Sequence, residues 1–323
     1  MNFDHGIPLE RWEIFFHALR DRLSEANEKN PSARYWKGIT LRAEIINVIK
    51  RNRPKLLTTF PPAYEVMEHL QRIGWIQPIK VQYPEEVSPI EFFLADMAAG
   101  ENELIDPLEL LQAYLPSGVI CYFSALVYYE LTTQVAAHHH IAQLNRPKPK
   151  ANLGGAEPPK FDESMKRIKR NPLGTEIFRF HDVIYYKTRR DASLIPGIQI
   201  RIVSPRSWLR VTTMEQTLLD TLLQPLRCGG EAVVLEAWEI GIKRIDVDRM
   251  AEHLAKIGRE DLDRRVGTIL DLVGADFSST LLGSRLKRLK ERLTGGSQDV
   301  VSIPLLPSFT FTEWNDTWKV QVP

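Results

Sequence analysis

The residues that most readily suggest chemistry are three consecutive histidines, His138, His139 and His140. Imidazole is a common zinc ligand, and a zinc site needs several ligands to converge on one point. Neighbouring side chains point to opposite faces of a strand and lie about 100° apart around a helix, so consecutive histidines seldom meet at one ion. No second ligand cluster follows nearby in the sequence. We expect no metal site, and we predict that the histidines form a loop leading into a strand at 141–144.

Carboxylates near a lysine are the other candidate chemistry, because a metal-dependent nuclease needs acids to hold its ions. Two sets could take this form: Asp182 with Lys187, and Glu236 and Glu239 with Lys243. The two glutamates are three residues apart in a helical segment, a spacing that suits surface ion pairs. The sequence has no phosphate-binding glycine loop and no Gly-x-Ser-x-Gly nucleophile turn. We predict no catalytic residue and no cofactor, and a nuclease centred on Asp182 or Glu236 stays as an alternative.

A group of basic residues between positions 42 and 55 could bind nucleic acid through its phosphates. The net charge of the chain is only +1, so any such binding must come from a local patch. The next helix offers His69, Gln71 and Arg72. Glu65 and Glu68 lie beside them, so its polar face is nearly neutral. Solvated cations favoured by the helix dipole are the alternative interpretation. The predicted DNA-binding residues are Arg42, Lys50, Arg51, Arg53, Lys55, Gln71 and Arg72.

These basic residues fall in a segment with helical periodicity. Apolar residues at helical spacing predict an amphipathic helix over 9–27. Thr40 is expected to cap a second helix, which Pro54 ends. The proline pair at 61–62 suits the first turn of a third helix, and Gly74 suits its C-terminal cap.

An extended segment at 75–83 follows, and Pro78 restricts it to an edge or a bulge of a sheet. Helices followed by a strand in this order are typical of a winged helix-turn-helix domain, which we predict over residues 1–88. Simple three-helix packing would give much the same pattern and remains an alternative.

Residues 89–323 are predicted to form a larger mixed α/β domain, so that the chain as a whole has an α+β fold. The run 116–132 is apolar almost all round and belongs in a core. Residues 145–176 are rich in Pro, Gly and Lys and are predicted to be a flexible insertion. Strands are expected at 177–180, 183–188 and 198–203, and helices at 90–98, 107–115, 231–241, 247–257, 262–272 and 279–293.

Composition is typical of a globular protein of the cytosol. The chain of 323 residues is 43% apolar and 26% charged, and it is long enough for two domains. The longest apolar run, 118–129, is too short to span a bilayer, and acids stand where a signal peptide would be basic and then apolar. We therefore expect a cytoplasmic protein in which Cys121 and Cys228 are buried, reduced thiols.

The best-defined stretch of the chain is 200–230. Alternating residues predict a strand that ends before Pro205. Threonines at 212–213 stand three residues before an acid and an amide at 215–216. Either threonine can therefore cap the first backbone amides of a helix, while the acid or amide side chain reaches back to the backbone of that threonine. Pro225 stops this helix. One face is expected to be buried, formed by Met214, Leu218, Leu219, Leu222 and Leu223.

This stretch resembles the central signature of the AbiEi-type antitoxins of type IV toxin–antitoxin systems. The matching residues are Ser204-Pro205, the run VTTMEQTLLD at 211–220, and Cys228-Gly229-Gly230-Glu231. In that family a strand, an E-x-T-L-L-D helix and a Gly-Gly turn follow in this order. We expect structural roles for its acids: Glu215 favours the helix dipole and Asp220 anchors a neighbouring loop or backbone amide.

Two further segments are similar to the family. Phe123-Ser124-Ala125-Leu126 and residues 131–134 align with a helix of its members, although Tyr129 and Glu130 stand where the family usually shows His-Gly. The tail at 304–320 resembles the way the family ends, so the similarity covers roughly 118–320 apart from the insertion. The residues that carry the motif are Ser124, Leu126, Thr213, Glu215, Leu219, Asp220, Gly229 and Gly230.

The resemblance implies a regulator of transcription that is also an antitoxin. The N-terminal domain would bind operator DNA and repress the protein's own operon, and the C-terminal domain would counteract a nucleotidyltransferase-like toxin without a cofactor. Family members bind inverted repeats, so self-association on DNA is expected. Two alternatives stay open: a neutralising interaction module that does not bind DNA, and a metal-dependent nuclease of a defence system.

A second basic surface is expected on the helix over 279–293. Its leucines, including Leu281, are expected to face inward. The outward face is either plain solvated surface or a docking surface for an acidic partner or nucleic acid. Its basic residues are Arg285, Lys287, Arg288, Lys290 and Arg292.

Overall fold

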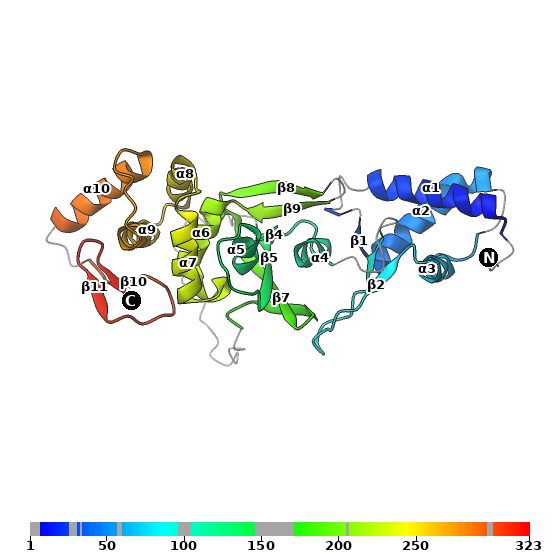
Figure 1. Cartoon of the computed structure of the whole chain (residues 1–323), viewed down its shortest axis with the longest axis horizontal. Coiled ribbons are helices and arrows are strands. Elements are labelled where there is room, and N and C mark those ends of the chain that lie inside the picture. The colour runs from blue at the N-terminus through cyan, green and yellow to red at the C-terminus, as the bar shows by residue number, and fades with distance from the viewer. Residues whose placement is uncertain are drawn as a thin grey trace, which may run out of the picture. The chain divides into compact units, whose positions relative to one another are not determined.

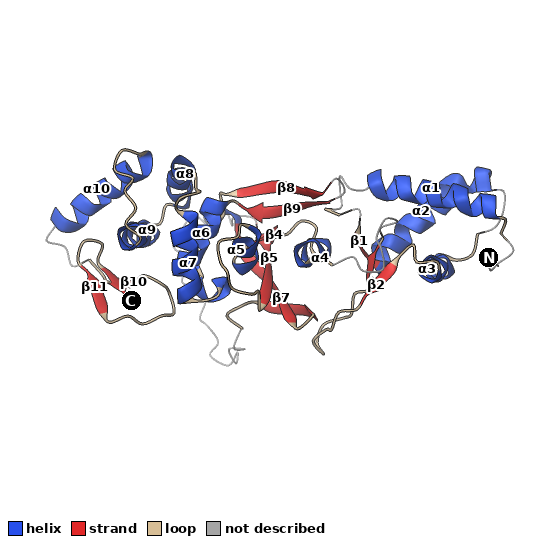
Figure 2. Cartoon of the chain, in the orientation of Figure 1, coloured by secondary structure: helices blue, strands red, loops and turns tan. Residues whose placement is uncertain are grey.

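The computed structural model describes residues 7–25, 31–32, 34–56, 60–95, 105–145, 171–204, 207–295 and 300–323. Helices and strands are mixed along these residues, which confirms the coarse α+β prediction (Figures 1 and 2). The chain divides into two compact units. The first comprises Met1–Gly118, Ile177–Tyr185 and Ile200–Arg210, and the second comprises Val119–Glu176, Tyr186–Gln199 and Val211–Pro323. None of the helices in the described ranges has both the length and the apolar character needed to cross a bilayer.

The first unit begins with helices that pack around aromatic residues. Its elements are α1 (Leu9–Glu25), β1 (Tyr35–Lys37), α2 (Gly38–Leu56), α3 (Ala63–Arg72), β2 (Gln77–Ile79), β3 (Phe92–Leu94) and α4 (Pro107–Tyr114). The sheet has the order β1-β3-β2, and both pairs are antiparallel. β2 is therefore an edge strand, as Pro78 predicted. One core cluster extends from Ile7 to Ala95 and includes Trp12, Phe15, Leu41 and Leu70.

Three details of this unit differ from the sequence predictions. The helix predicted over 90–98 is wrong within the described residues, because Phe92–Leu94 is the central strand β3 and pairs on both sides. All of its side chains are buried, so no alternating pattern marked it as a strand. α2 begins at Gly38 directly after β1, and not at a Thr40 cap. Pro54 lies inside the last turn of α2, which continues to Leu56.

A six-stranded sheet has the order β6-β7-β5-β4-β9-β8. Within it, β4 pairs antiparallel with β5 and parallel with β9. The strands are β4 (Val119–Ile120), β5 (His138–Asn145), β6 (Thr175–Phe180), β7 (Val183–Asp191), β8 (Ile198–Ser204) and β9 (Ser207–Thr212).

The apolar run 116–132 is largely buried, as predicted, and it forms β4 followed by the short helix α5 (Phe123–Tyr128). His138 to His140 belong to β5, so the prediction of a loop there is wrong. β9 was not predicted. Most of the predicted insertion, 146–170, lies outside the described residues, while its two ends at Asn145 and 175–176 belong to β5 and β6.

Helices dominate the second unit after the sheet. They are α6 (Met214–Leu223), α7 (Glu231–Gly241), α8 (Val247–Ile257), α9 (Glu260–Leu272) and α10 (Leu281–Gly295), followed by the short strands β10 (Ile303–Pro304), β11 (Glu313–Asn315) and β12 (Val320–Val322). These bounds confirm the predicted helices within two residues at each end. Gly258 ends α8 in the left-handed conformation, with φ of 66°. α6 differs from its prediction because every residue from Glu215 to Leu223 is buried, so it is enclosed on all sides.

Candidate nucleic-acid interface and buried polar network

The predicted basic residues of α2 are all exposed on one helix. α2 buries Leu41, Ile45 and Val48 in the core of the first unit, which turns the polar positions outward. In the described chain, no acidic side chain forms an ion pair with any of these cations. They are therefore available to phosphates. The residues are Arg42, Lys50, Arg51, Arg53 and Lys55.

α3 presents a different surface. Tyr64 is 54% exposed, Glu68 and Arg72 are exposed, and Gln71 is half-buried. His69 is only 4% exposed and stacks on the ring of Trp12, with 4.3 Å between the ring centroids. The prediction that His69 belongs to the polar face is therefore wrong, because the core of this unit takes it up. The remaining polar face of α3 is nearly neutral.

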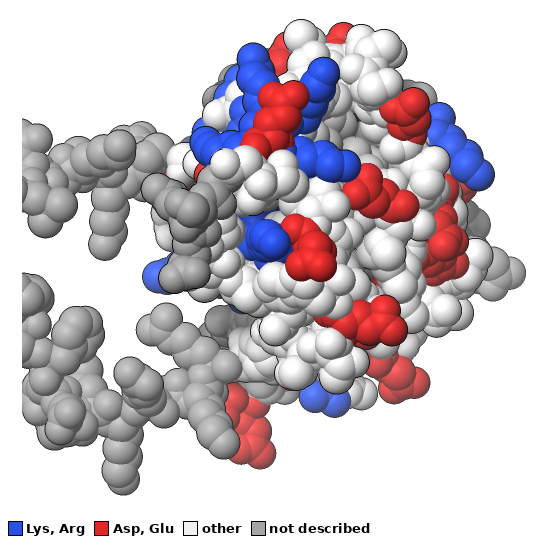
Figure 3. Space-filling model, turned by 90° about the vertical axis from the view of Figure 1, so that its left-hand side faces the viewer, with Lys and Arg blue, Asp and Glu red and all other residues white. Residues whose placement is uncertain are grey.

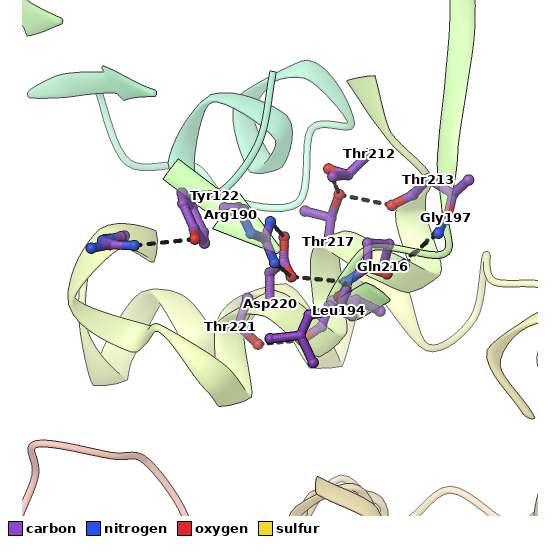
Figure 4. Close-up of polar contacts among 12 residues, drawn as sticks. Tyr122, Arg190, Leu194, Gly197, Thr212, Thr213, Gln216, Thr217, Asp220 and Thr221 are labelled. Atoms are coloured by element: carbon purple, nitrogen blue, oxygen red, sulfur yellow. Dashed lines mark hydrogen bonds and ion pairs between the residues drawn. The ribbon is translucent and has the colours of Figure 1, made fainter. Parts of the chain in front are cut away.

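The most tightly bonded part of the second unit is a buried ion pair between β7 and α6. The guanidinium of Arg190 donates two hydrogen bonds of 2.6 Å, one to each carboxylate oxygen of Asp220 (Figure 4). The two side chains are 7% and 0% exposed. The sequence predicts an anchoring role for Asp220 but with a loop or a backbone amide as its partner, and it gives no sign of Arg190. Nothing local to either residue marks the pair, which is 30 positions apart.

Gln216 extends this network toward the segment before β8. Its amide donates to a carboxylate oxygen of Asp220 at 2.9 Å and to the Leu194 carbonyl at 3.3 Å, and its own carbonyl accepts from the Gly197 amide at 3.4 Å. Thr213 caps α6 as predicted, because its hydroxyl accepts a hydrogen bond of 3.2 Å from the backbone N–H of Gln216. The expected reciprocal hydrogen bond, from the backbone N–H of the capping threonine to the side chain of residue 215 or 216, is not among the contacts of these described residues. The side chain of Gln216 is instead the link between α6 and the 194–197 segment.

Glu215 also departs from the expected capping role. One of its carboxylate oxygens accepts from the Asp246 amide at 3.0 Å, and the other lies 3.7 Å from a guanidinium nitrogen of Arg249. The side chain is 3% exposed although it lies in the first turn of α6. Glu215 therefore joins the start of α6 to the start of α8.

Tyr122 lies between two guanidinium groups. Arg190 is 4.7 Å and Arg227 is 5.4 Å from the centre of its ring, and Arg227 also donates to the Tyr122 hydroxyl at 3.2 Å. Tyr122 has a φ of 57°, which is rare for a residue with a side chain. The neighbouring thiols are buried and unpaired, as predicted. Burial raises the pKa of Cys121 to about 12 and raises the pKa of Cys228 well above its usual value, so neither thiol is poised to react.

The remaining signature residues hold the backbone. Ser124 accepts a 2.6 Å hydrogen bond from the His140 amide, which joins α5 to β5. Leu126 and Leu219 are completely buried. Gly229 and Gly230 have φ of 96° and 90°, so both occupy a conformation that favours glycine, and Gly230 precedes the first residue of α7.

Tyr129 stands where the family usually shows histidine, and it too has a structural contact. Its hydroxyl donates to the Thr212 carbonyl at 2.7 Å, immediately before the cap of α6. The departure from the family pattern therefore falls at a position that ties α5 to the start of α6.

The three histidines of β5 split between two faces of the strand. The Nε2 of His140 lies 3.0 Å from the Nδ1 of His138, while His139 points to the other face and lies 3.2 Å from the Ser124 hydroxyl. Burial lowers the pKa of His139 to about 4 and that of His140 well below the usual range. Across the described ranges, no group of three or more His, Cys, Asp and Glu side chains is placed to hold a metal ion.

Among the acids weighed for a nuclease, Glu236 has a structural role. Glu236 accepts hydrogen bonds from the hydroxyl of Thr132 at 2.6 Å and from the amide and hydroxyl of Thr133 at 3.0 and 2.6 Å. These bonds lower its pKa. Asp182 lies in the exposed turn between β6 and β7, and Glu239 and Lys243 are exposed. Glu236 therefore joins α7 to the segment after α5.

The basic residues of α10 divide into two groups. Arg285 donates to Asp263 of α9 at 2.6 and 2.9 Å, and Arg292 donates to Glu260 of α9 at 2.6 Å. Lys287, Arg288 and Lys290 are exposed. Figure 3 shows Lys and Arg side chains gathered in one part of the face that it draws. Leu281 is 63% exposed, so the expectation that it faces inward is wrong, whereas the four later leucines of α10 are buried.

Comparisons with known proteins establish the fold of the chain only. No protein-family model matches the sequence, and none of the curated proteins matches it. A crystal structure of the RV2827C protein from Mycobacterium tuberculosis is similar, with a TM-score of 0.52 and 14% sequence identity, and the match covers 98% of this chain and 92% of that one. At this identity the likeness speaks for a shared fold and says nothing about activity.

Proposed function

We propose that this protein is a DNA-binding antitoxin of the type IV class, which represses its own operon and counteracts a nucleotidyltransferase-like toxin. The observation that carries the DNA-binding half is the first unit itself. Its order α1-β1-α2-α3-β2-β3, with a β1-β3-β2 sheet, fits a winged helix-turn-helix, and α2 exposes a cluster of cations that form no ion pair with an acid among the described residues. Such a regulator would act in the cytosol.

In this arrangement phosphate contacts would supply most of the affinity. The cations of α2 are suited to phosphates, while Gln71 and Tyr64 of α3 are the side chains best placed for base edges. A nearly neutral α3 carries few such donors, so sequence discrimination per site would be modest. Self-association on an inverted repeat would then raise the local concentration of weak half-site contacts.

The antitoxin half rests on the resemblance of the 211–231 segment and its neighbours to the AbiEi-type family. The motif residues serve as a framework: Thr213 caps α6, Asp220 fixes it to β7, and the double glycine turns the chain into α7. A framework of this kind supports partner handling rather than a reaction centre. A nuclease has less support, because Glu236 is already engaged by Thr132 and Thr133.

The DNA-binding half is tested by a gel shift on the protein's own upstream region across a series of salt concentrations. Arg51→Ala with Arg53→Ala should weaken binding and lower the slope of log K against log salt by about 2, since each lost phosphate contact lowers it by about 0.9. The matched control is Lys243→Ala with Lys256→Ala, which removes the same charge from exposed positions of the second unit. Equal affinity and slope for both doubles would contradict DNA binding through α2.

The antitoxin half is tested by co-expression with the product of the adjoining open reading frame. The wild-type chain should relieve growth arrest. Rescue by a protein that shifts no promoter fragment would favour the alternative of a neutralising module without DNA binding, which the near-neutral α3 makes a specific second candidate. Failure of the wild type to rescue would contradict the antitoxin assignment. Metal-dependent cleavage of nucleic acid that Glu236→Ala or Asp182→Ala abolishes would instead point to the nuclease.

A further inference from the structure

The helix α10 carries more positive charge than the chain as a whole. The helix has five basic residues and one acid, whereas the whole chain has a net charge of +1. Burial of Leu282, Leu286, Leu289 and Leu293 fixes one side of the helix against the second unit. The cations are therefore turned toward solvent by the packing of the leucines.

Two of the five cations hold the helix in place. Arg285 forms a bidentate pair with Asp263, whose side chain is 9% exposed, and Arg292 pairs with Glu260. Both acids belong to α9. These contacts explain Arg285 and Arg292 as structural residues, and they anchor α10 through its second and last turns.

The other three cations have no structural partner. Lys287, Arg288 and Lys290 are exposed, and within the described chain no acid forms an ion pair with any of them. Positive charges so close together repel one another, and binding of a polyanion would relieve this repulsion. Lys287 and Lys290 are about 4.5 Å apart along the helix axis. One strand of a duplex carries a phosphate for about every 3.4 Å along the duplex axis. Residues three apart on a helix lie side by side, so these two long side chains can reach phosphates of the same strand.

The surrounding residues favour a nucleic acid over an acidic protein. Protein interfaces rely on apolar or aromatic anchors in desolvated pockets. The other exposed side chains after Leu281 are polar or charged, namely Ser284, the acidic Glu291, Arg292 and Thr294. The exposed Leu281 lies about 9 Å along the axis from Lys287, at the start of the helix. We propose that the α10 cation face, formed by Lys287, Arg288 and Lys290, binds the phosphodiester backbone of nucleic acid without reading its sequence.

This site differs from the one on α2 and can be tested apart from it. The full chain carrying Arg51→Ala and Arg53→Ala provides the background. Fluorescence anisotropy over a salt series measures binding to two probes, a DNA duplex of arbitrary sequence and a single-stranded RNA. Adding Lys287→Ala with Lys290→Ala should lower the slope of log K against log salt by about 1.8 on the duplex and about 1.4 on the single strand. A loss confined to one probe identifies that nucleic acid as the ligand.

The matched control adds Lys243→Ala with Lys256→Ala to the same background, and it should leave both slopes unchanged. Equal slopes for the two doubles would overturn the proposal, as would a failure of the background protein to bind either probe. Binding to poly-glutamate with no binding to nucleic acid would also overturn it and favour an acidic protein partner. Thermal melts by circular dichroism confirm that both doubles are folded. The operator gel shift is a separate measurement, so the proposed α2 interface can fail while this site stands.

Discussion

At the scale of single residues, a buried ion pair joins two elements of the second unit. Asp220 and Arg190 neutralise one another inside the unit, and the side-chain amide of Gln216 donates a further hydrogen bond to one of the two carboxylate oxygens. A buried ion pair adds little net stability, yet the loss of one partner leaves an uncompensated charge behind. Asp220 therefore matters for the integrity of the unit.

Asp220→Asn should lower the free energy of unfolding by about 3–5 kcal/mol, because the guanidinium of Arg190 stays buried without a countercharge. The double variant Arg190→Met with Asp220→Leu should cost far less, since apolar side chains of similar volume often replace a buried pair with little loss. Urea unfolding measures both. A double variant as unstable as Asp220→Asn would contradict this account of the pair.

The histidines of β5 make stability depend on pH. Burial lowers the pKa of His139 to about 4 in the folded protein, against a usual value of 6.5. The unfolded chain therefore takes up a proton first as the pH falls. Stability is complete above pH 6.5 and is lost between 6.5 and about 4, by roughly 3 kcal/mol at most for this residue.

The urea concentration at the midpoint of unfolding, measured at a pH of about 7.5 and again at about 4.5, tests this loss of stability. His139→Gln should reduce the difference between the two midpoints, whereas His17→Gln, on an exposed position of α1, should leave it as it is in the wild type. Equal pH dependence in all three proteins would show that His139 titrates normally.

At the scale of elements, local signals located most of the helices and the strands β6, β7 and β8, whereas long-range contacts decided strands such as β3 and β9. The Thr213 cap of α6, the Gly258 cap of α8 and Pro107 at the start of α4 are all visible within a few residues. β3 and β9 are not, because β3 is buried on both faces, and β9 alternates only between buried and half-buried positions, with the polar Ser207 and Thr212 among the buried ones. The turn between α6 and α7 depends on backbone geometry that only glycine adopts readily.

Gly229→Ala should destabilise the protein by about 2–4 kcal/mol. The residue has φ of 96°, and an added Cβ would lie 2.7 Å from the ring of Phe123. Gly258→Ala is the matched control, because φ there is 66° but the nearest atom to an added Cβ is 3.9 Å away. We expect it to cost about 1 kcal/mol. Thermal and urea unfolding compare the two, and equal costs would argue against close packing at Gly229.

At the scale of the whole molecule, the core cluster of the first unit comes from one stretch of the sequence. The unit itself also includes the later segments 177–185 and 200–210. The residues of the core cluster run from Ile7 to Ala95, and they include Phe93 of the central strand β3. The N-terminal domain predicted over 1–88 stops before that strand. The segment that carries the exposed cations of α2 therefore has a core of its own once β3 is included.

A fragment of residues 1–95 should fold by itself and melt cooperatively. A fragment of residues 1–88 should not, because β1 and β2 each pair only with β3 in their sheet. Circular dichroism melts of the two fragments measure this. Cooperative melting of both at the same temperature would mean that β3 contributes little to the fold.

The sequence by itself determined the α+β class, most of the helices, the caps of α6 and α8, the buried thiols, and the exposure of the basic residues of α2. These features depend on contacts within about four residues, which periodicity and capping side chains report directly. The tertiary structure alone decided that Arg190 neutralises Asp220, that His69 is a core residue, that His138 to His140 lie in a strand, and which cations of α10 are paired. The reason is physical: strand pairs and buried ion pairs join residues tens of positions apart, and no local pattern records which of them the folded chain brings together.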